Sequence, residues 1–202
     1  MAAPKNLPRV TYYVAASLDG FIAGPDGGLE WLELAEWPGE DYGYEAFLTT
    51  VDALIMGRRT WEFVAAHPPW PYADRPTRVF SGRPLSPALP GVTRVEGHPG
   101  TVVRDLSADG HEHIWLVGGG GLAATLAGEG YLTDLILTLV PCTLGGGTLL
   151  FGSEGARQSW TLVQSRSFES GVVQIHVRPG LGGSHDGAEA GPPSPPEPGR
   201  PG

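Results

Sequence analysis

The chain has 202 residues, of which 41% are hydrophobic, so it is long enough for one sizeable α/β domain. Its 13 Lys and Arg against 22 Asp and Glu give a formal net charge of −9, which argues against a nucleic-acid-binding or anionic-membrane surface. The single cysteine, Cys142, excludes an internal disulfide framework and a multi-cysteine zinc site, and we expect it to be a small core residue.

The two ends of the chain differ in composition from its middle. Residues 1–8 contain no apolar run typical of a secretory signal, and no stretch approaches the ~20 apolar residues that span a bilayer. Seven glycines and seven prolines occur among the 24 residues 179–202, which predicts a disordered tail. We therefore expect a flexible N-terminus over 1–8, one folded domain over 9–178, and a cytoplasmic protein.

The first predicted strand, residues 10–16, is rich in β-branched and aromatic residues and nearly free of charge, as a strand buried on both faces should be. It ends in the turn Ser17-Leu18-Asp19-Gly20, and a loop with strong turn chemistry follows over 24–28. Four large apolar residues come next, and they either cover a cleft or pack beneath this loop: Trp31, Leu32, Leu34 and Trp37.

A helix is predicted over 41–51, because apolar side chains recur there at helical spacing. The second buried strand, 52–57, leads directly into a helix that begins Arg58-Arg59-Thr60. Two arginines and a threonine at a helix start suit an anion, and the alternative is an ordinary solvated helix terminus. A short strand, 78–80, ends in another small turn that contains a cation, Ser81-Gly82-Arg83.

A strand over 91–95 and a short element over 102–106 precede a buried strand at 114–117. That strand enters four consecutive glycines, and a helix is predicted over 122–128. Without Cβ atoms the turn can adopt positive φ and admit another group closely, and the helix N-terminus suits a phosphate. The alternative is a glycine turn required only for tight strand-to-helix packing.

The last buried strand, 133–140, is followed by two alternating runs at 160–168 and 172–177 that are joined by a tight turn. These runs predict an antiparallel hairpin at the edge of the sheet. His111 and His113 have no third ligand at a suitable spacing, so we expect no metal site.

Three strand ends lead into glycine-containing turns, after Met56, Phe80 and Val117. In a parallel sheet these ends lie on one edge, so the turns could together hold an extended phosphorylated ligand. The glycines at 118 and 120 with Ala123 match a dinucleotide fingerprint, but the acidic ribose partner expected about 20 residues later is missing. Arginine in place of the acid favours a cofactor with a 2′-phosphate, and hence NADP over NAD.

In combination and order, four segments resemble the dihydrofolate reductase-like superfamily: 14–23, 55–62, 117–120 and 137–141. The closer likeness, over residues 9–178, is to the branch that contains the C-terminal reductase domain of bacterial riboflavin-biosynthesis enzymes (RibD C-terminal domain-like). The resemblance implies a three-layer α/β fold with a mostly parallel central sheet and a C-terminal antiparallel hairpin. It also implies NADPH as cofactor and a homodimer.

The resemblance also implies which residues form the cofactor site. Four residues at the start of one helix would face the cofactor phosphates: Gly57, Arg58, Arg59 and Thr60. Either Arg59 or Arg83 is placed near the 2′-phosphate, and Ser81 and Gly82 on the adenosine side. The pyrophosphate and nicotinamide side is assigned the glycine turn: Gly118, Gly119, Gly120, Gly121 and Leu122. Three residues at and after the end of the first strand would border the nicotinamide: Ala16, Asp19 and Ile22.

On the substrate side, the resemblance implies Thr138 as a contact and a cis peptide bond between Gly118 and Gly119. Reduction of a C=N bond leaves a nitrogen that needs a proton, from a carboxylic acid with a raised pKa or from an ordered water. Asp41 matches the helix-borne carboxylate of true dihydrofolate reductases, with Glu40 and Glu45 as competitors. The alternative is that Asp41 is only a charge at a helix N-terminus.

The expected function is that of an NADPH-dependent reductase of the dihydrofolate reductase or 5-amino-6-(5-phosphoribosylamino)uracil reductase type. It would transfer a hydride to a pterin, pyrimidine or related heterocyclic small molecule. Folate itself is disfavoured, because the loop before the acid departs from the folate enzymes. The full riboflavin-pathway activity is disfavoured too, because the deaminase domain is absent from this sequence. The alternative is a catalytically inactive NADP-binding or regulatory protein of the same fold.

Overall fold

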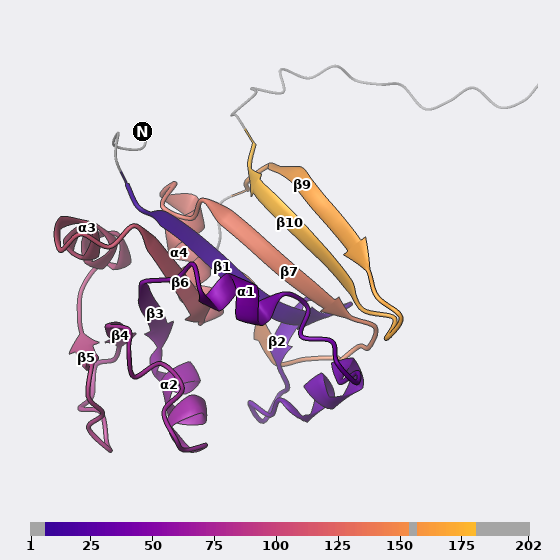
Figure 1. The fold of residues 1–202 in the computed structure, drawn as a ribbon, viewed down its shortest axis with the longest axis horizontal. Helices are drawn as coiled ribbons and strands as arrows, with labels where there is room; N and C mark the ends of the chain where they lie inside the picture. The colour runs from indigo at the N-terminus through magenta and orange to yellow at the C-terminus, as the bar shows by residue number, and fades with distance from the viewer. Residues whose placement is uncertain (1–6, 154–156, 181–202) are drawn as a thin grey trace, which may run out of the picture.

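The computed structural model describes residues 7–153 and 157–180, which form a large sheet with helices on both sides (Figure 1). The strands of the large sheet are β1 (Arg9–Ser17), β3 (Ala53–Gly57), β4 (Thr77–Phe80), β5 (Val92–Val95), β6 (His113–Gly118), β7 (Asp134–Val140), β9 (Trp160–Ser167) and β10 (Val173–Pro179). A small sheet pairs β2 (Phe21–Ala23) with β8 (Thr148–Leu149). The helices are the 3-10 helix η1 (Glu30–Ala35), α1 (Tyr44–Leu48), α2 (Arg58–Ala65), α3 (Pro99–Ala108) and α4 (Gly120–Gly128).

The large sheet has the strand order β5-β4-β3-β6-β1-β7-β10-β9. All pairs from β5 to β7 are parallel, whereas β10 pairs antiparallel with β7, and β9 pairs antiparallel with β10. The predicted mostly parallel sheet with a C-terminal antiparallel hairpin is therefore confirmed. β1 lies between β6 and β7, which explains why its sequence is almost free of charge.

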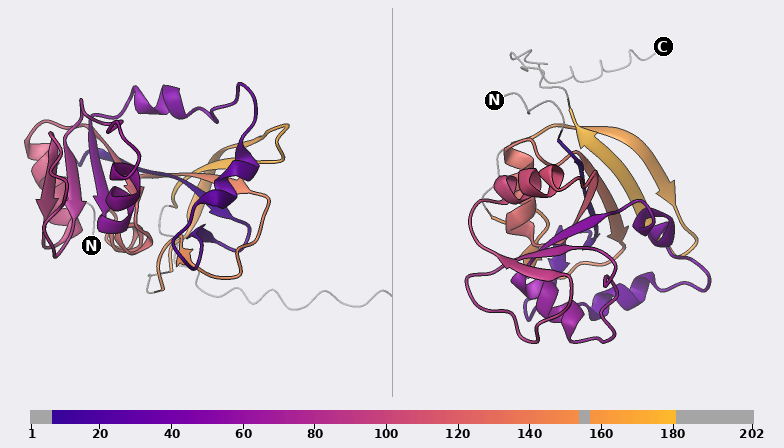
Figure 2. Two further views of the ribbon diagram at one scale, coloured as in Figure 1. Left: turned by 90° about the horizontal axis from the view of Figure 1, so that it is seen from below. Right: turned by 60° about the vertical axis from the view of Figure 1, so that its left-hand side comes forward.

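Helices lie on both faces of the large sheet (Figure 2). One apolar cluster on each face holds the layers together. Side chains of β3 alternate between them: Ile55 packs on the side of α3 and α4, and Met56 on the side of α1 and α2. The first cluster contains Leu126 of α4, and the second contains Trp61 of α2, which is 1% exposed. The sheet is thus covered by helices on both faces, as the three-layer prediction requires.

Several predicted elements have different bounds in the structure. The helix expected over 41–51 is only α1, because Gly43 adopts φ 84° directly before it and the Thr50 hydroxyl bonds the Phe47 carbonyl directly after it. The short element at 102–106 belongs to α3, a ten-residue helix with Pro99 at its start, a position that proline favours. The helix after the glycine turn begins at Gly120 rather than at 122.

The ends of the folded domain also differ from the prediction. Leu7 packs against the core and Pro8 is buried, so the ordered chain begins before residue 9. β10 continues to Pro179, and the Gly180 N–H bonds the Ser159 carbonyl. The remaining parts of the expected flexible N-terminus and disordered tail, 1–6 and 181–202, lie outside the described residues. Cys142 is partly exposed, so its prediction as a core residue is wrong.

A buried carboxylate joins three strands at the amino end of β1. Asp134, whose side chain is 3% exposed, accepts hydrogen bonds from Arg9 Nε at 3.0 Å, Arg178 Nε at 2.9 Å and Thr133 Oγ1 at 2.8 Å. His176 Nε2 lies 2.6 Å from the same carboxylate. Burial raises the pKa of Asp134, but these hydrogen bonds together hold it well below its usual range.

We expect Asp134→Asn to lower the free energy of unfolding at pH 7 by about 1–3 kcal/mol, because a charged acceptor is removed from three donors. Since the folded-state pKa of Asp134 lies below its unfolded value, its contribution is complete above about pH 4 and is lost as the pH falls further. Urea unfolding at pH 7 and pH 3 measures both effects. The exposed Asp109→Asn is the matched control, and an equal gap between wild type and Asp134→Asn at the two pH values would contradict the assignment.

Candidate active site

A cavity of about 700 Å³ opens at the carboxyl ends of β1, β3 and β6. This volume lies within the range of small-molecule sites, and the place is where ligands bind in open α/β sheets. The residues that line the cavity form two walls of different chemistry. We call them the glycine wall and the aromatic wall.

The glycine wall consists of the two turns that leave β3 and β6: Gly57, Arg58, Arg59, Thr60, Gly118, Gly119, Gly120 and Gly121. A Cβ on Gly118 would lie 2.7 Å from Thr60 Oγ1, and one on Gly120 would lie 2.0 Å from the Leu149 carbonyl oxygen. Packing alone therefore explains the glycines at 118 and 120. It does not explain Gly121, which is exposed and where a Cβ would meet nothing within 4 Å.

Two helices begin at the glycine wall. α2 starts after Gly57 and α4 starts after Gly119, and neither helix has a side-chain cap on its first turn. The first N–H groups of such helices need partners, and the positive end of each dipole favours an anion. The cis peptide bonds of the described residues are Pro68-Pro69 and Ser86-Pro87. The bond between Gly118 and Gly119 is therefore trans, contrary to the expectation.

The two arginines of the glycine wall have different roles. Arg58 Nη1 donates to Ser81 Oγ at 3.0 Å and to the carbonyls of Arg83 and Pro84, and its Nε pairs with Glu62 at 2.7 Å. Arg58 therefore ties the loop after β4 to α2. The Arg59 side chain is exposed and makes no hydrogen bond or ion pair with any residue in the described ranges. It is the cation of this wall that remains available to a ligand.

Several expected cofactor residues do not line the cavity. Ser81, 8% exposed, binds Arg58 and the backbone of Arg83, while Gly82 and Arg83 are exposed beside it. Ala16 is fully buried in the core, and Leu122 is partly buried and packs against the same core cluster. Ile22, in contrast, lines the cavity.

Asp19 and Thr138 are also held away from the cavity by bonds to their neighbours. The Asp19 carboxylate accepts the Ser17 hydroxyl at 2.6 Å and the Gly145 N–H at 2.7 Å, so it anchors the loop after β7. The Ser17 bond is the main cause that lowers the pKa of Asp19 to about 2. Thr138 Oγ1 accepts a hydrogen bond from Gln174 Nε2 at 3.0 Å across the sheet.

The expected proton donor, Asp41, does not reach the cavity. Its exposed carboxylate accepts the Gly43 N–H at 2.8 Å and the Glu45 N–H at 2.9 Å, which is the contact of a helix cap. The N–H groups of Glu45 and Gly43 hold the pKa of Asp41 below its usual range, opposite to what a general acid needs. Its competitors Glu40 and Glu45 do not line the cavity either, so the carboxylate assignment is corrected to a capping role.

The aromatic wall was not predicted from the sequence as a unit. It consists of Tyr13, Tyr44, Phe63, Tyr72 and Trp115, which come from β1, α1, α2, the loop before β4, and β6. Tyr44 and Tyr72 contact Trp115 edge to face, with ring centroids 5.7 and 5.5 Å apart, and their hydroxyls lie 3.4 Å from each other.

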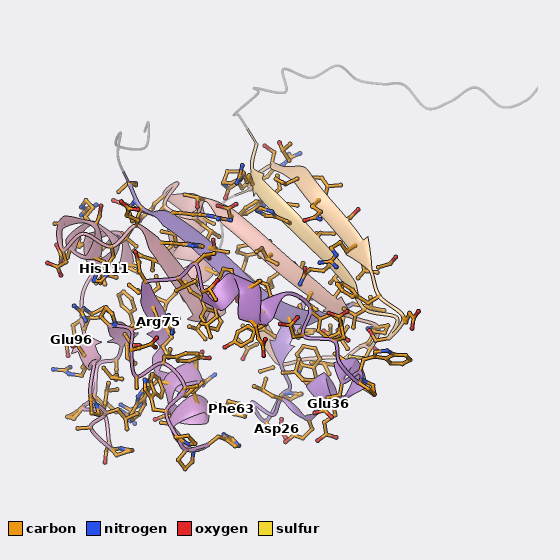
Figure 3. All side chains as sticks on the ribbon, viewed as in Figure 1. Asp26, Glu36, Phe63, Arg75, Glu96 and His111 are labelled. Carbon is orange, nitrogen blue, oxygen red and sulfur yellow. The ribbon has the colours of Figure 1, made fainter. Side chains whose placement is uncertain are left out.

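The segment after β2 supplies the remaining apolar cover. Of the four large residues expected to cover a cleft, Trp31 and Leu32 line the cavity, whereas Leu34 and Trp37 stay 60% and 45% exposed. Figure 3 labels Phe63 of α2, which lines the cavity, and Asp26, the neighbour of the lining residue Gly27.

The described lining contains no Asp, Glu, His, Lys or Cys; its ionisable side chains are three tyrosines and the two arginines at the start of α2. Burial raises the pKa of Tyr72 and is the main cause of the raised pKa of Tyr13, so both phenols are neutral. Within 7–153 and 157–180, no three potential metal ligands gather, and no helix is both long and apolar enough to cross a membrane.

A mostly parallel sheet covered on both faces, ending in an antiparallel hairpin and opening a glycine-walled cavity at its strand ends, defines an α/β protein of the dihydrofolate reductase-like class. Residues 85–174 match the model of the RibD C-terminal domain. The chain is 34% identical to the uncharacterized protein YwjB of Bacillus subtilis over 171 residues, which cover 84% of this chain and 98% of YwjB. The chain belongs to the RibD C-terminal domain family, and the resemblance predicted from its motifs is confirmed.

Solved structures agree with this assignment. A putative riboflavin biosynthesis protein from Shewanella sp. PV-4 superposes with a TM-score of 0.77 at 29% identity, over 86% of this chain and 99% of that protein. Dihydrofolate reductase from Enterococcus faecalis, solved as a complex with NADP(H), superposes with a TM-score of 0.61 at 20% identity, over 85% and 96% of the two chains. At 20% identity, the likeness to dihydrofolate reductase is evidence for a shared fold alone.

We expect Asp41→Ala to lower the free energy of unfolding by about 1 kcal/mol, because the cap of α1 is lost, and Asp41→Asn to change it by a few tenths at most. The asparagine amide oxygen can still accept the bond from the Glu45 N–H in the first turn of α1, although it loses the second acceptor that binds the Gly43 N–H. Urea unfolding of both variants measures the difference. An Asn variant as unstable as the Ala variant would show that the charge, and not the cap, matters at this position.

Proposed function

We propose that this chain is an NADPH-dependent reductase that transfers a hydride to a pterin, a pyrimidine or a related heterocycle. The observation that carries the proposal is the meeting of two uncapped helix N-termini and Arg59 at the glycine wall of one cavity. Membership of the RibD C-terminal domain family supports a reductase, and the NADP(H) complex of the Enterococcus enzyme supports the cofactor on the same fold.

The residues present fit a dinucleotide with an additional phosphate. The first N–H groups of α2 and α4 would hold its pyrophosphate, and Gly121 leaves room for the close approach that this requires. Arg59, exposed and without a protein partner in the described residues, would bind the 2′-phosphate. When bound, NADPH supplies a hydride.

The aromatic wall, with Trp31 and Leu32 of the segment after β2, would orient the substrate and exclude water. Tyr44, Tyr72 and Trp115 present rigid rings against which a planar substrate can be oriented, and Trp31 and Leu32 shield the cavity from bulk water. The reduced nitrogen also needs a proton. In this proposal an ordered water delivers it, because the described lining residues include no carboxylic acid and the Tyr13 hydroxyl already donates to the Tyr42 carbonyl at 3.0 Å.

Cofactor binding tests the proposal directly. We expect the chain to bind NADPH more tightly than NADH, and Arg59→Ala to weaken NADPH binding by about 10- to 100-fold through loss of a charged hydrogen bond. The affinity for NADH should change by no more than about twofold, since NADH lacks the 2′-phosphate. Isothermal titration calorimetry measures all four dissociation constants.

Arg83→Ala is the matched control, because Arg83 is exposed and does not line the cavity. A loss of NADPH preference in Arg83→Ala instead of Arg59→Ala would move the 2′-phosphate to the loop after β4. Absence of NADPH binding by the wild type would overturn the proposed function. Tight binding without NADPH oxidation in the presence of any heterocycle would favour the alternative, a catalytically inactive NADP-binding protein.

We also propose that the chain forms a homodimer through the hairpin of β9 and β10. β9 is at the end of the sheet, and its exposed backbone edge accompanies Leu162 and Val163, which are 59% and 48% exposed. Sedimentation should give twice the chain mass of 21.3 kDa, and Leu162→Glu should give the monomer mass. Leu34→Glu, at a residue 60% exposed on η1, is the matched control and should remain dimeric.

A further inference from the structure

We infer that the substrate is an uncharged planar ring that has no phosphate group. The inference rests on the proposed function and specifies the substrate class of the same cavity. It starts from the groups that remain for a substrate once the glycine wall is assigned to the cofactor. These are the aromatic wall and the segment of residues 24–36, which passes over it.

The aromatic wall offers no cation to a phosphate. The arginines of the lining are both at the start of α2, where Arg58 is bound by Ser81, Arg83, Pro84 and Glu62, and Arg59 belongs to the cofactor site. A phosphate placed among Tyr44, Tyr72 and Trp115 would lose its hydration without gaining a counter-charge. Burial of an unpaired charge is strongly unfavourable, so this wall selects against phosphorylated compounds.

The aromatic wall also offers no anion to a positively charged ring. The carboxylates within two residues of its members do not line the cavity: Glu45, Glu62 and Asp74. Glu62 pairs with Arg58, and Asp74 pairs with Arg75. The polar groups that remain are neutral hydroxyls. Those of Tyr44 and Tyr72, 3.4 Å apart, bind each other weakly and can still donate to a carbonyl oxygen of a neutral ring.

The segment 24–36, which we call the acidic segment, strengthens the selection at the opening. It supplies the lining residues Gly27, Leu29, Trp31 and Leu32, and over its whole length it contains four carboxylates and no Lys or Arg. The four carboxylates are exposed: Asp26, Glu30, Glu33 and Glu36. Figure 3 shows Asp26 and Glu36 on this segment. A negative opening repels an approaching phosphate, and the repulsion weakens with salt.

Matched ligands test the inference without relying on turnover. The full chain, saturated with NADP⁺, is titrated calorimetrically with 5-amino-6-ribosylaminouracil and with its 5′-phosphate. We expect the unphosphorylated compound to bind at least about tenfold more tightly, a difference of about 1.4 kcal/mol. The preference should shrink as the salt concentration rises.

Charge reversal on the acidic segment measures how much this segment contributes to the preference for the unphosphorylated ligand. In Glu33→Lys/Glu36→Lys the phosphorylated compound should bind several-fold more tightly, with the affinity of the unphosphorylated compound unchanged. Glu112→Lys is the control, because Glu112 is exposed at the amino end of β6, away from the cavity.

Equal binding of the two ligands, tighter binding of the phosphate, or binding of neither one to the NADP⁺-saturated chain would overturn the inference. The NADP⁺ titration that precedes these measurements separates the two failures. A chain that binds NADP⁺ but prefers the phosphate contradicts only the substrate class. A chain that binds no NADP⁺ contradicts the proposed function.

Discussion

The cavity depends on a close approach of backbone segments that only glycine permits. Gly118 lies against the Thr60 side chain, and Gly120 lies against the Leu149 carbonyl, where any Cβ would overlap the oxygen. The first contact brings the start of α2 to the end of β6, and the second brings β8, and with it β2, to the start of α4. The glycine wall and the small sheet beside the cavity therefore depend on the same turn. A side chain at either glycine would separate elements that have to meet for the site to exist.

Most charged side chains near this edge are already engaged in holding the fold. Asp19 anchors the loop after β7, Asp41 caps α1, and Arg58 ties the loop after β4. Arg75 does the same elsewhere, where it donates to the carbonyls of Val51 and Leu48. A charged group that is fully hydrogen-bonded by protein has little left to offer a ligand. The chemistry of the cavity is therefore left to few groups, namely backbone N–H groups, Arg59, phenols and aromatic rings.

The features that were predictable from the sequence are those with a local cause. Near-continuous apolar runs predicted the buried strands, alternating runs predicted the C-terminal hairpin, and consecutive glycines predicted the turn after β6. Which charges are available to a ligand has only a partial local signature: Arg58 and Asp19 each have one partner close in sequence, Glu62 and Ser17, and one far away, Ser81 and Gly145. The aromatic wall was missed for the same reason, since five separate elements contribute to it. Asp41 is instructive, because its capping role was visible locally and the family likeness favoured the other interpretation.

The shared carboxylate at the amino end of the sheet connects the two ends of the described chain. Arg9 near the start of the described chain and Arg178 near its end both bind Asp134, so the two ends lie side by side on the edge of the sheet opposite the cavity (Figure 1). One carboxylate therefore holds the first and the last strand of the described chain together, at the ends of these strands that lie away from the cavity.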